Sequence, residues 1–265
     1  EMTPTDDLAF SKGITPLLSM KDIEEVHISV SFTYDKDEAE FIAEQLTQAG
    51  FKVKIGGPVY GDITTKFVPG MYLKKGVVIT STGCGNKCWF CKVWKRVGGL
   101  IELEIQDGYV LQDDNILSCS EPHIRAVFAM LKRQKRKAEF RGGLEAKILE
   151  PWHIELLYDL QPKSMYFAYD TPDDYEPLVQ AGKMLKQAGF TLKDRHNYCY
   201  CLIGYPKDTM EAAEKRMIDT LKAGFMPFAM LYKDDQGHED KEWRRFSRLW
   251  ARAGIIVARN KEYFA

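Results

Sequence analysis

Apolar and polar positions follow two alternating periods near the start of the chain. Residues 26–32, VHISVSF, form a short apolar run typical of a strand, and the segment after it places Ile42 and Leu46 on one face of a helix. Gly50 ends this helical pattern, and FKVKI at 51–55 begins a second strand. The order strand, helix, glycine, strand predicts a βαβ unit.

The same kind of unit recurs further along the chain. The tripeptide Ala-Gly-Phe occurs at 49–51, 188–190 and 223–225, and each time it closes a helical pattern. Each helix is followed, at once or after a short loop, by a strand-like run. This repetition predicts parallel βα units rather than an antiparallel sheet.

Strand candidates and helical patterns alternate after residue 76. The strand candidates are GVVITS, NILSCS, AEFRGG, SMYFAYD, YCYCLIG and MPFAMLY. The helical patterns lie at about 121–137, 151–161, 173–188, 210–223 and 241–252. Between the first two strands, LIELEIQDGYVLQDD is typical of a hairpin that turns at Asp107-Gly108.

These patterns predict an α/β fold, namely a partial (β/α)6 TIM-like barrel with a small N-terminal βαβ layer. Six units are too few for a full eight-stranded barrel. We expect the N-terminal layer over 1–76, the partial barrel over 77–235, and a C-terminal helix and tail over 236–265 that pack on the barrel. No linker rich in Pro, Gly or Ser separates the first two parts, so we expect them to pack together.

The composition is that of an ordinary globular protein. It is 45% hydrophobic and 28% charged, and the net charge of −1 gives no overall field that favours nucleic acid or an anionic membrane. No run of about 18 apolar residues and no signal peptide is apparent. We therefore expect a cytoplasmic protein with reduced cysteines and no membrane partner.

The stretch STGCGNKCWFCKVW at 81–94 carries the clearest chemical signal. It places Cys84, Cys88 and Cys91 in the spacing C-x3-C-x2-C, although the whole chain has only six cysteines. The loop follows the first strand of the expected barrel, and active sites of βα barrels gather at the carboxyl ends of the strands.

Three types of site compete for these cysteines. A structural zinc site usually has four ligands in two pairs, and Cys199-x-Cys201 is too tightly spaced to supply the second pair. Inert buried cysteines are a second alternative, which the crowding on a glycine-rich loop disfavours. An iron–sulfur cluster with three protein thiolates and one open iron is the favoured interpretation.

With an aromatic residue before its last cysteine, this motif resembles that of the radical S-adenosylmethionine (SAM) superfamily. The resemblance covers about residues 77–232. It implies that Cys84, Cys88 and Cys91 hold one [4Fe–4S] cluster, whose open iron is chelated by the amino and carboxylate groups of SAM. It also implies that Phe90 lies near the adenine of SAM.

Further SAM contacts are implied by the same resemblance. A Gly-Gly-Glu motif of the family binds the methionine amino group, and FRGGLEA offers Gly142 and Gly143, with Leu144 at the place of the acid and Glu145 one residue later. The family's ribose and adenine contacts fall on Tyr169, Asp170, Gly204 and Met230. The alternatives are a helix N-cap for Asp170, a turn for Gly204 and a core position for Met230.

The implied activity is that of a radical SAM enzyme. Such an enzyme reductively cleaves SAM to methionine and a 5′-deoxyadenosyl radical, which abstracts hydrogen from a substrate. A one-electron donor such as flavodoxin or ferredoxin is the expected partner. The substrate is unidentified, and a nucleotide or nucleic-acid base is our hypothesis. Modification of a peptide or protein side chain and a non-catalytic iron–sulfur redox protein are the alternatives, and SAM binding separates the last from the others.

Two other features have a plain and a functional interpretation. Cys119, Cys199 and Cys201 fall on expected strands and suit small apolar core positions, with a hydrogen-atom donor or a second-cluster ligand as the alternative. The run KRQKRK at 132–137 ends an expected helix, where cations suit the helix dipole. A patch for nucleic acid or a redox partner is the alternative for this run.

Overall fold

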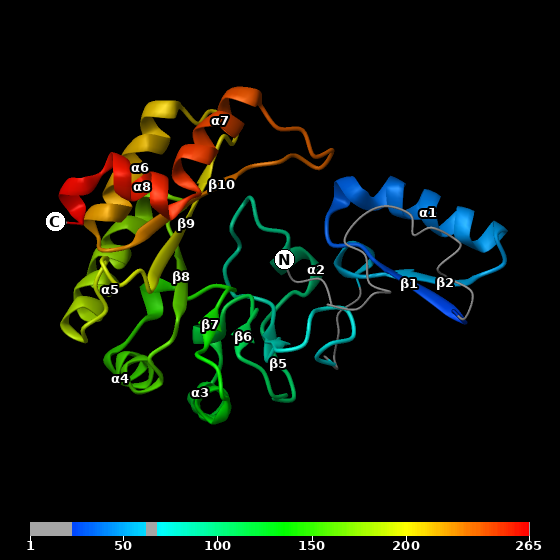
Figure 1. The fold of residues 1–265 in the computed structure, drawn as a ribbon, viewed down its shortest axis with the longest axis horizontal. Coiled ribbons are helices and arrows are strands. Elements are labelled where there is room, and N and C mark those ends of the chain that lie inside the picture. The colour runs from blue at the N-terminus through cyan, green and yellow to red at the C-terminus, as the bar shows by residue number, and fades with distance from the viewer. Residues whose placement is uncertain (1–22, 62–67, 265) are drawn as a thin grey trace.

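The computed structural model describes residues 23–61 and 68–264. The parts of the expected N-terminal layer at 1–22 and 62–67 lie outside the described residues. In the remainder of that layer, β1 (Glu25–Ser29) and β2 (Lys52–Gly56) pair in parallel, and α1 (Lys36–Gln48) connects them. The predicted βαβ unit is confirmed, and it forms a small lobe beside the larger part of the molecule (Figure 1).

A parallel sheet of six strands forms the centre of the larger part. Its strands stand in the order β10-β9-β8-β7-β6-β3, and every neighbouring pair is parallel. In chain order they are β3 (Val77–Val78), β6 (Val110–Leu111), β7 (Glu139–Phe140), β8 (Ser164–Ala168), β9 (Asn197–Ile203) and β10 (Met226–Leu231). The α/β class with parallel βα units is thus confirmed. β3 and β10 lie at the two edges, so the described strands form an open sheet and no closed barrel.

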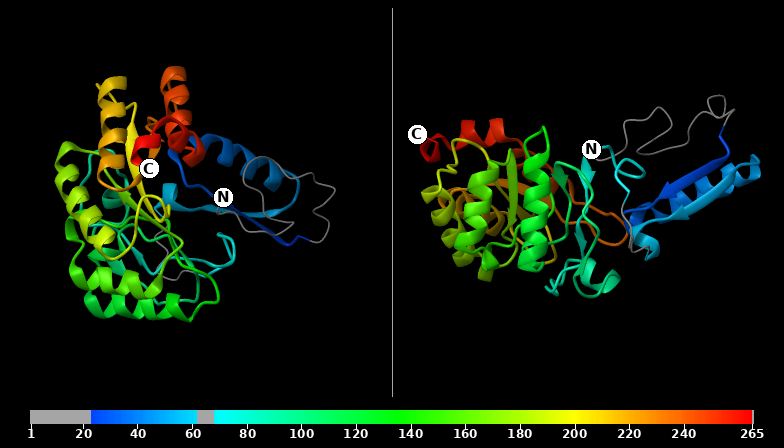
Figure 2. Two further views of the ribbon diagram at one scale, coloured as in Figure 1. Left: turned by 60° about the vertical axis from the view of Figure 1, so that its left-hand side comes forward. Right: turned by 90° about the horizontal axis from the view of Figure 1, so that it is seen from below.

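Helices cover one face of this sheet (Figures 1 and 2). They are α3 (Glu121–Arg133), α4 (Pro151–Leu160), α5 (Tyr175–Gln187), α6 (Met210–Lys222), α7 (Lys241–Trp250) and α8 (Ala253–Arg259). Burial alternates along β9 with the period of a strand, because Cys199, Cys201 and Ile203 are buried and Tyr198, Tyr200 and Leu202 are only partly so. Cys201 Sγ lies 3.3 Å from Thr220 Oγ1 on α6, so the first set faces the helices. The second set lies on the opposite face, which we call the open face.

The hydrophobic core fills the layer between the sheet and the helices. Its largest fully buried side chains include Phe140, Met165, Phe167, Phe225 and Trp250. Trp250, at the end of α7, is 1% exposed, so the C-terminal segment contributes to this core. The helix predicted for 241–252 ends at Trp250, and α8 follows it as a separate helix.

The predicted strand NILSCS is wrong. The second strand of the sheet is β6 (Val110–Leu111), and Ile116–Ser118 forms a 3-10 helix. Both residues of β6 are buried although they point to opposite faces of the sheet, and a strand covered on both faces needs apolar residues at successive positions. Val110 and Leu111 satisfy this requirement, whereas NILSCS carries serines at 118 and 120. Cys119 therefore lies after a 3-10 helix and not on a strand.

The hairpin predicted at Asp107-Gly108 is also wrong. β5 (Ile101–Glu102) pairs antiparallel with β4 (Ser81–Thr82), which follows β3 directly. The second half of the predicted hairpin joins the central sheet instead, where β6 pairs with β3. The cysteine loop lies between β4 and β5, and the pairing of these two strands brings its ends together.

A buried carboxylate connects the ends of β3 and β6. Asp113 is 1% exposed and accepts hydrogen bonds from Thr80 N–H (2.8 Å), the Thr80 hydroxyl (2.7 Å) and the Ser81 hydroxyl (2.6 Å). Burial raises the pKa of Asp113 to about 6, although these hydrogen bonds act in the opposite direction. The carboxylate thus fixes the position at which the chain leaves β3.

Asp113→Asn tests this linkage. The raised pKa means that ionisation of Asp113 destabilises the native state, and this cost is lost as the pH falls through about 6 toward the ordinary value of 3.8. We expect the unfolding free energy of the wild type to rise relative to Asp113→Asn by about 1 kcal/mol between pH 7 and pH 5. Chemical denaturation of both proteins at both pH values measures this change. A difference that does not vary with pH would contradict the raised pKa.

Candidate active site at the carboxyl ends of the strands

The cysteine loop is closed at its base by a pair of glycines. Gly83 has a φ of +86°, and its N–H donates to Asp114 Oδ2 at 2.8 Å. A side chain at Gly83 would overlap the carbonyl of Gly99. Glycine is therefore required at 83 both by the left-handed backbone and by the close approach of the two ends of the loop.

The three cysteines of the motif are free and partly buried. Cys91 N–H donates to the Cys88 carbonyl at 3.1 Å, and the indole N–H of Trp94, on the short helix α2 (Val93–Arg96), donates to the same carbonyl at 3.1 Å. Burial raises the pKa of the Cys88 thiol, and the neighbouring Cys91 and Cys84 raise it further. Burial also raises the pKa of Cys91. In residues 23–61 and 68–264, no three His, Cys, Asp or Glu side chains converge closely enough to hold a metal ion.

Asn115 joins the cysteine loop to the segment after β7. Its Nδ2 lies 3.7 Å from Cys84 Sγ, 2.6 Å from Glu145 Oε2 and 2.8 Å from Ser118 Oγ. Its Oδ1 is buried without a hydrogen-bond partner among the described residues. Sequence reasoning missed Asn115 because it was assigned to the start of a strand. The structure brings Glu145 and Cys84 to the same place through this side chain.

Gly142 and Gly143 lie between β7 and Glu145. Gly142 N–H donates to the Leu111 carbonyl and Gly143 N–H donates to the Asp113 carbonyl, each at 3.2 Å. A side chain at Gly142 would overlap the Asp113 carbonyl. Gly142 is therefore required for the close approach of the segments after β6 and β7, whether or not a ligand binds. The hydrogen bonds of the described residues leave the carbonyls of both glycines free to accept from a ligand.

Tyr169 and Asp170 lie on opposite faces of the sheet. Tyr169 is 5% exposed, faces the helices and packs against Tyr175, with the ring centroids 5.6 Å apart. Asp170 Oδ1 accepts a hydrogen bond from Leu202 N–H on β9 at 2.8 Å, and burial raises the pKa of Asp170 to about 6. Thr171 caps the helical segment that follows, so the N-cap alternative for Asp170 is wrong. Only Asp170 of this pair lies toward the cysteine loop.

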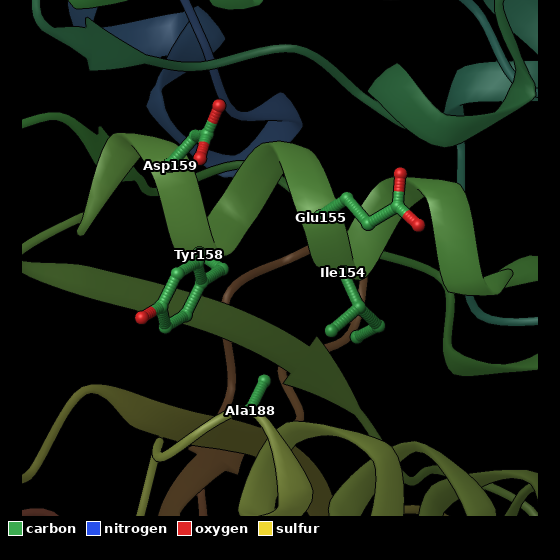
Figure 3. A pocket seen from close by; sticks show the side chains of 5 residues that line it. All are labelled: Ile154, Glu155, Tyr158, Asp159 and Ala188. Atoms are coloured by element: carbon green, nitrogen blue, oxygen red, sulfur yellow. The ribbon is translucent and has the colours of Figure 1, made fainter.

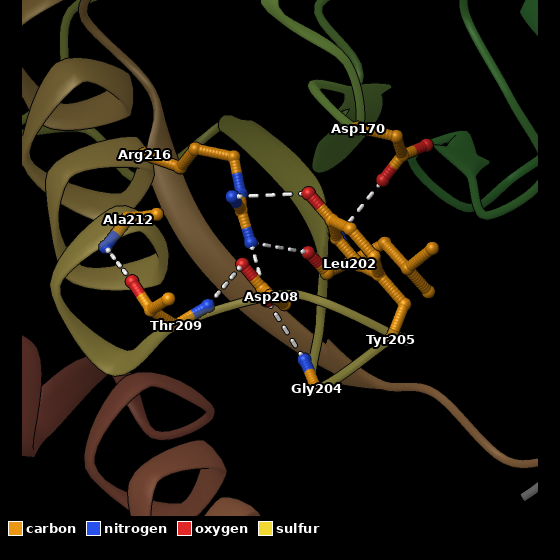
Figure 4. A network of polar contacts seen from close by, with 8 residues as sticks. All are labelled: Asp170, Leu202, Gly204, Tyr205, Asp208, Thr209, Ala212 and Arg216. Carbon is orange, nitrogen blue, oxygen red and sulfur yellow. Dashed lines mark hydrogen bonds and ion pairs between the residues drawn. The ribbon is translucent and has the colours of Figure 1, made fainter.

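Gly204 forms the turn after β9, which the sequence analysis gave as the alternative to a SAM contact. It has a φ of +70°, and its N–H donates to Asp208 Oδ2 at 2.9 Å. Asp208 also pairs with Arg216 at 2.7 Å, and Arg216 donates to the Leu202 carbonyl at 3.1 Å (Figure 4). A side chain at Gly204 would meet the indole of Trp243 at 2.9 Å. This buried network fixes the end of β9.

Met230 lies outside the core, because its side chain is 42% exposed. It is paired in register with Leu202 on β9 and therefore shares the open face with it. Phe90 is partly buried in the cysteine loop, and its ring contacts Trp89 with the centroids 5.4 Å apart.

Trp89 of the cysteine loop contacts residues at the edge of the sheet opposite to β3. Its ring centroid lies 5.5 Å from that of Tyr205 and 6.0 Å from that of Tyr232. These tyrosines follow β9 and β10, whereas the loop itself follows β3 at the other edge. The loop therefore spans the carboxyl ends of the strands. Sequence reasoning missed Tyr205 and Tyr232, because contacts between segments so far apart in the sequence leave no local pattern.

The other three cysteines lie outside this loop. Cys199 and Cys201 face the helices and are fully buried, which raises the pKa of Cys199 well above its ordinary value. Burial also raises the pKa of Cys119 to about 11. Protonated, buried thiols suit the core positions predicted for these cysteines.

The basic run 132–137 lies at the amino ends of the strands, whereas the cysteine loop lies at their carboxyl ends. It connects the end of α3 to the start of β7, and in a parallel sheet such connections lie at the amino ends of the strands. Lys132 and Arg133 form exposed ion pairs with Asp159 (3.6 Å) and Asp107 (3.5 Å). This position makes the run unsuited to contact a substrate held beside the cysteines.

A surface hollow lies on the outer, helical side of the molecule (Figure 3). It is lined by Ile154, Glu155, Tyr158 and Asp159 of α4 and by Ala188 at the end of α5. None of these side chains belongs to the predicted site. Glu155 and its neighbours therefore provide positions for control substitutions.

No protein-family model matches the chain, and no curated protein matches it. Among the described residues, no helix combines the length and the apolar character needed to cross a membrane. Function must therefore be inferred from the arrangement of the residues themselves.

Gly83→Ala should open the base of the cysteine loop. A side chain in the left-handed conformation costs about 1 to 2 kcal/mol, which corresponds to a factor of about 5 to 30 in an opening equilibrium. We expect Cys84, Cys88 and Cys91 of the protein purified without added metal to react with a thiol reagent faster by about that factor. Gly85→Ala is the matched control, because a side chain there meets no atom within 4 Å. Equal reaction rates for the two variants would contradict the role of Gly83.

Proposed function

We propose that the chain is a radical SAM enzyme and that Cys84, Cys88 and Cys91 hold its single [4Fe–4S] cluster. One observation carries this proposal: the C-x3-C-x2-C loop follows the first strand of a parallel sheet, and Asn115 contacts both Cys84 and Glu145. The open sheet and the position of the loop across its carboxyl ends support a partial TIM-like barrel as the architecture.

The donor set fits an iron–sulfur cluster. Iron–sulfur clusters are held by cysteine thiolates, and the motif supplies three free cysteines on one closed loop. Burial and mutual repulsion disfavour thiolates here, as the raised pKa values of Cys88 and Cys91 indicate. A bound metal centre removes this cost, because it deprotonates a coordinating thiol. Three cysteines leave one iron for SAM.

The residues around the loop suit the two ends of SAM. Glu145 has one carboxylate oxygen bonded to Asn115, which leaves the other to accept from the methionine amino group. The carbonyls of Gly142 and Gly143 can accept from the same group. Phe90 and Met230 are proposed to contact the adenine. When bound, the cluster supplies one electron to the sulfonium of SAM, which yields methionine and a 5′-deoxyadenosyl radical that abstracts hydrogen from the substrate.

The chain itself must position the reactants and exclude water. Trp89, between Cys88 and Cys91, packs against Tyr205 and Tyr232 and thereby covers the carboxyl ends of β9 and β10. Such aromatic cover limits the entry of solvent, which would otherwise compete for a reactive radical. Tyr169 faces the helices and has no part in this proposal.

A one-electron donor such as flavodoxin or ferredoxin is the proposed partner. The cysteine loop carries several exposed cations, namely Lys87, Lys92, Lys95 and Arg96, of which Lys92 pairs with Asp235 at 2.8 Å. A cluster of exposed cations attracts an acidic protein and increases the rate of encounter. The basic loop therefore provides a docking surface beside the cysteines.

The cysteine substitutions test the proposed function. Anaerobically reconstituted protein should bind about four irons per chain and, with a low-potential reductant and SAM, release 5′-deoxyadenosine and methionine. Cys84→Ala, Cys88→Ala and Cys91→Ala should each lose this release, since each removes a thiolate. Cys199→Ser and Cys201→Ser are the controls and should retain the cluster. A wild type that holds iron but never forms deoxyadenosine would instead be an iron–sulfur redox protein.

Glu145→Gln tests the methionine end of the SAM site. Loss of the charge that faces the amino group should raise the dissociation constant for SAM about tenfold, or about 1.4 kcal/mol. Equilibrium dialysis of the reconstituted protein with labelled SAM measures it. The control is Glu155→Gln on the outer face of α4, which should bind SAM as the wild type does. Equal affinity in both variants would place the methionine end elsewhere.

A further inference from the structure

The open face of the sheet carries a column of stacked tyrosines. The ring of Tyr166 on β8 lies 4.8 Å from that of Tyr198 and 4.7 Å from that of Tyr200, at interplanar angles of 15° and 22°. Tyr166 is thus stacked on both neighbours, which belong to β9. The rings continue along the strands toward their carboxyl ends, where the cysteine loop lies.

Tyr200 ends this column in a fixed orientation. Its hydroxyl donates to the Arg141 carbonyl at 3.3 Å, so its ring reaches across β8 toward the end of β7. Phe228 on β10 packs edge-on against it, with the centroids 5.7 Å apart. Tyr166 covers one face of the Tyr200 ring. The other face is directed toward the carboxyl ends of the strands.

Ala168 leaves space beside that second face. It is paired in register with Tyr200, and Phe228 is paired with Tyr200 from the other side, so the three form one row on the open face. Ala168 is exposed although it lies on an interior strand, whereas its neighbours Phe167 and Tyr169 are buried. A small exposed residue beside an ordered aromatic ring leaves that face of the ring open to a flat group, and we call this position the slot.

The next row toward the cysteines supplies the opposite side of the slot. It consists of Asp170, Leu202 and Met230, and Met230 is 42% exposed. Asp170 Oδ1 accepts from Leu202 N–H, while its other oxygen has no hydrogen-bond donor in the described part of the chain. Asp170 follows the carboxyl end of β8, on the side of the sheet where the cysteine loop lies.

We infer that this slot, formed by Tyr200, Ala168 and Asp170, binds the nucleobase of the substrate. A nucleobase can stack on Tyr200 and donate an N–H from its edge to the free oxygen of Asp170. A phenyl ring has no N–H to donate to that oxygen, so it would bind without this hydrogen bond to a charged group. The inference rests on the proposed function and gives it a substrate class: nucleosides, nucleotides or a nucleic-acid base turned out of its stack.

Binding of nucleotides to the reconstituted protein tests the slot. The 5′-monophosphates of guanosine, adenosine, cytidine and thymidine are titrated anaerobically, without reductant, in the presence of saturating SAM, and binding is followed by saturation-transfer NMR. N-acetyltryptophanamide is titrated in parallel as a peptide-like ring. Saturating SAM ensures that a nucleotide cannot occupy the position of the SAM adenine. At least one nucleotide should bind, and tryptophanamide should bind more weakly.

Two substitutions assign that binding to the slot. Ala168→Leu fills the space beside Tyr200, and Tyr200→Leu removes the stacking surface, so each should weaken nucleotide binding about tenfold or more. Tyr200→Phe keeps the ring and should bind nearly as the wild type does. Ala212→Leu is the matched control, because Ala212 is exposed on α6 and outside the site. Circular dichroism checks that each variant folds, and Ala168→Leu adds bulk only at an exposed position.

The results separate the slot from the proposed function. Absence of nucleotide binding to the wild type, or equal binding in Ala168→Leu and Ala212→Leu, would overturn the slot. Competition between nucleotide and SAM would assign the slot to the adenine of SAM instead, and tighter binding of tryptophanamide would favour a peptide substrate. The release of 5′-deoxyadenosine by the wild type is measured on the same preparation, so failure of the proposed function is recognised independently.

Discussion

Asp113, Asp114 and Asn115 follow β6 directly and connect three segments of the site. The Asp113 carboxylate holds the end of β3 through Thr80 and Ser81, and its carbonyl accepts from Gly143 N–H after β7. Asp114 holds the base of the cysteine loop at Gly83, and Asn115 contacts both Cys84 and Glu145. A shift of this segment would therefore move the cysteines and Glu145 at once. The proposed site depends on the polar contacts of these three residues.

The fold was predictable where the pattern is local and long. Helices such as α5 and α6 and strands such as β8 and β9 match the predicted runs closely, because their periodicity extends over many residues. β6 has only two residues, and the longer run NILSCS at 115–120 gave a stronger but false strand pattern. The error moved Asn115 from the site into a strand. Burial on both faces, which identifies Val110 and Leu111, is a property of the assembled sheet.

The site was predictable to the same extent. The cysteine spacing is local, so Cys84, Cys88 and Cys91 could be found in the sequence alone. The contacts of Asp113 and Asp114 join residues 31 to 33 positions apart, and no sequence pattern announces them. The opposite orientations of Tyr169 and Asp170 could have been predicted from the sequence. Successive residues of a strand point to opposite faces, so both could not contact one ligand from the end of β8.

Electrostatic interactions also connect the residues at the carboxyl ends of the strands. Asp170 and Asp174 both act on Cys88, Asp114 acts on Cys91, and each raises the pKa of the thiol it faces. Asp113 is buried and Asp170 is partly buried, and desolvation raises the pKa of each to about 6. Buried acidic groups are costly to maintain unless a bound group offsets their charge. SAM carries a sulfonium and an ammonium group, so the field at this edge complements the cofactor proposed to bind there.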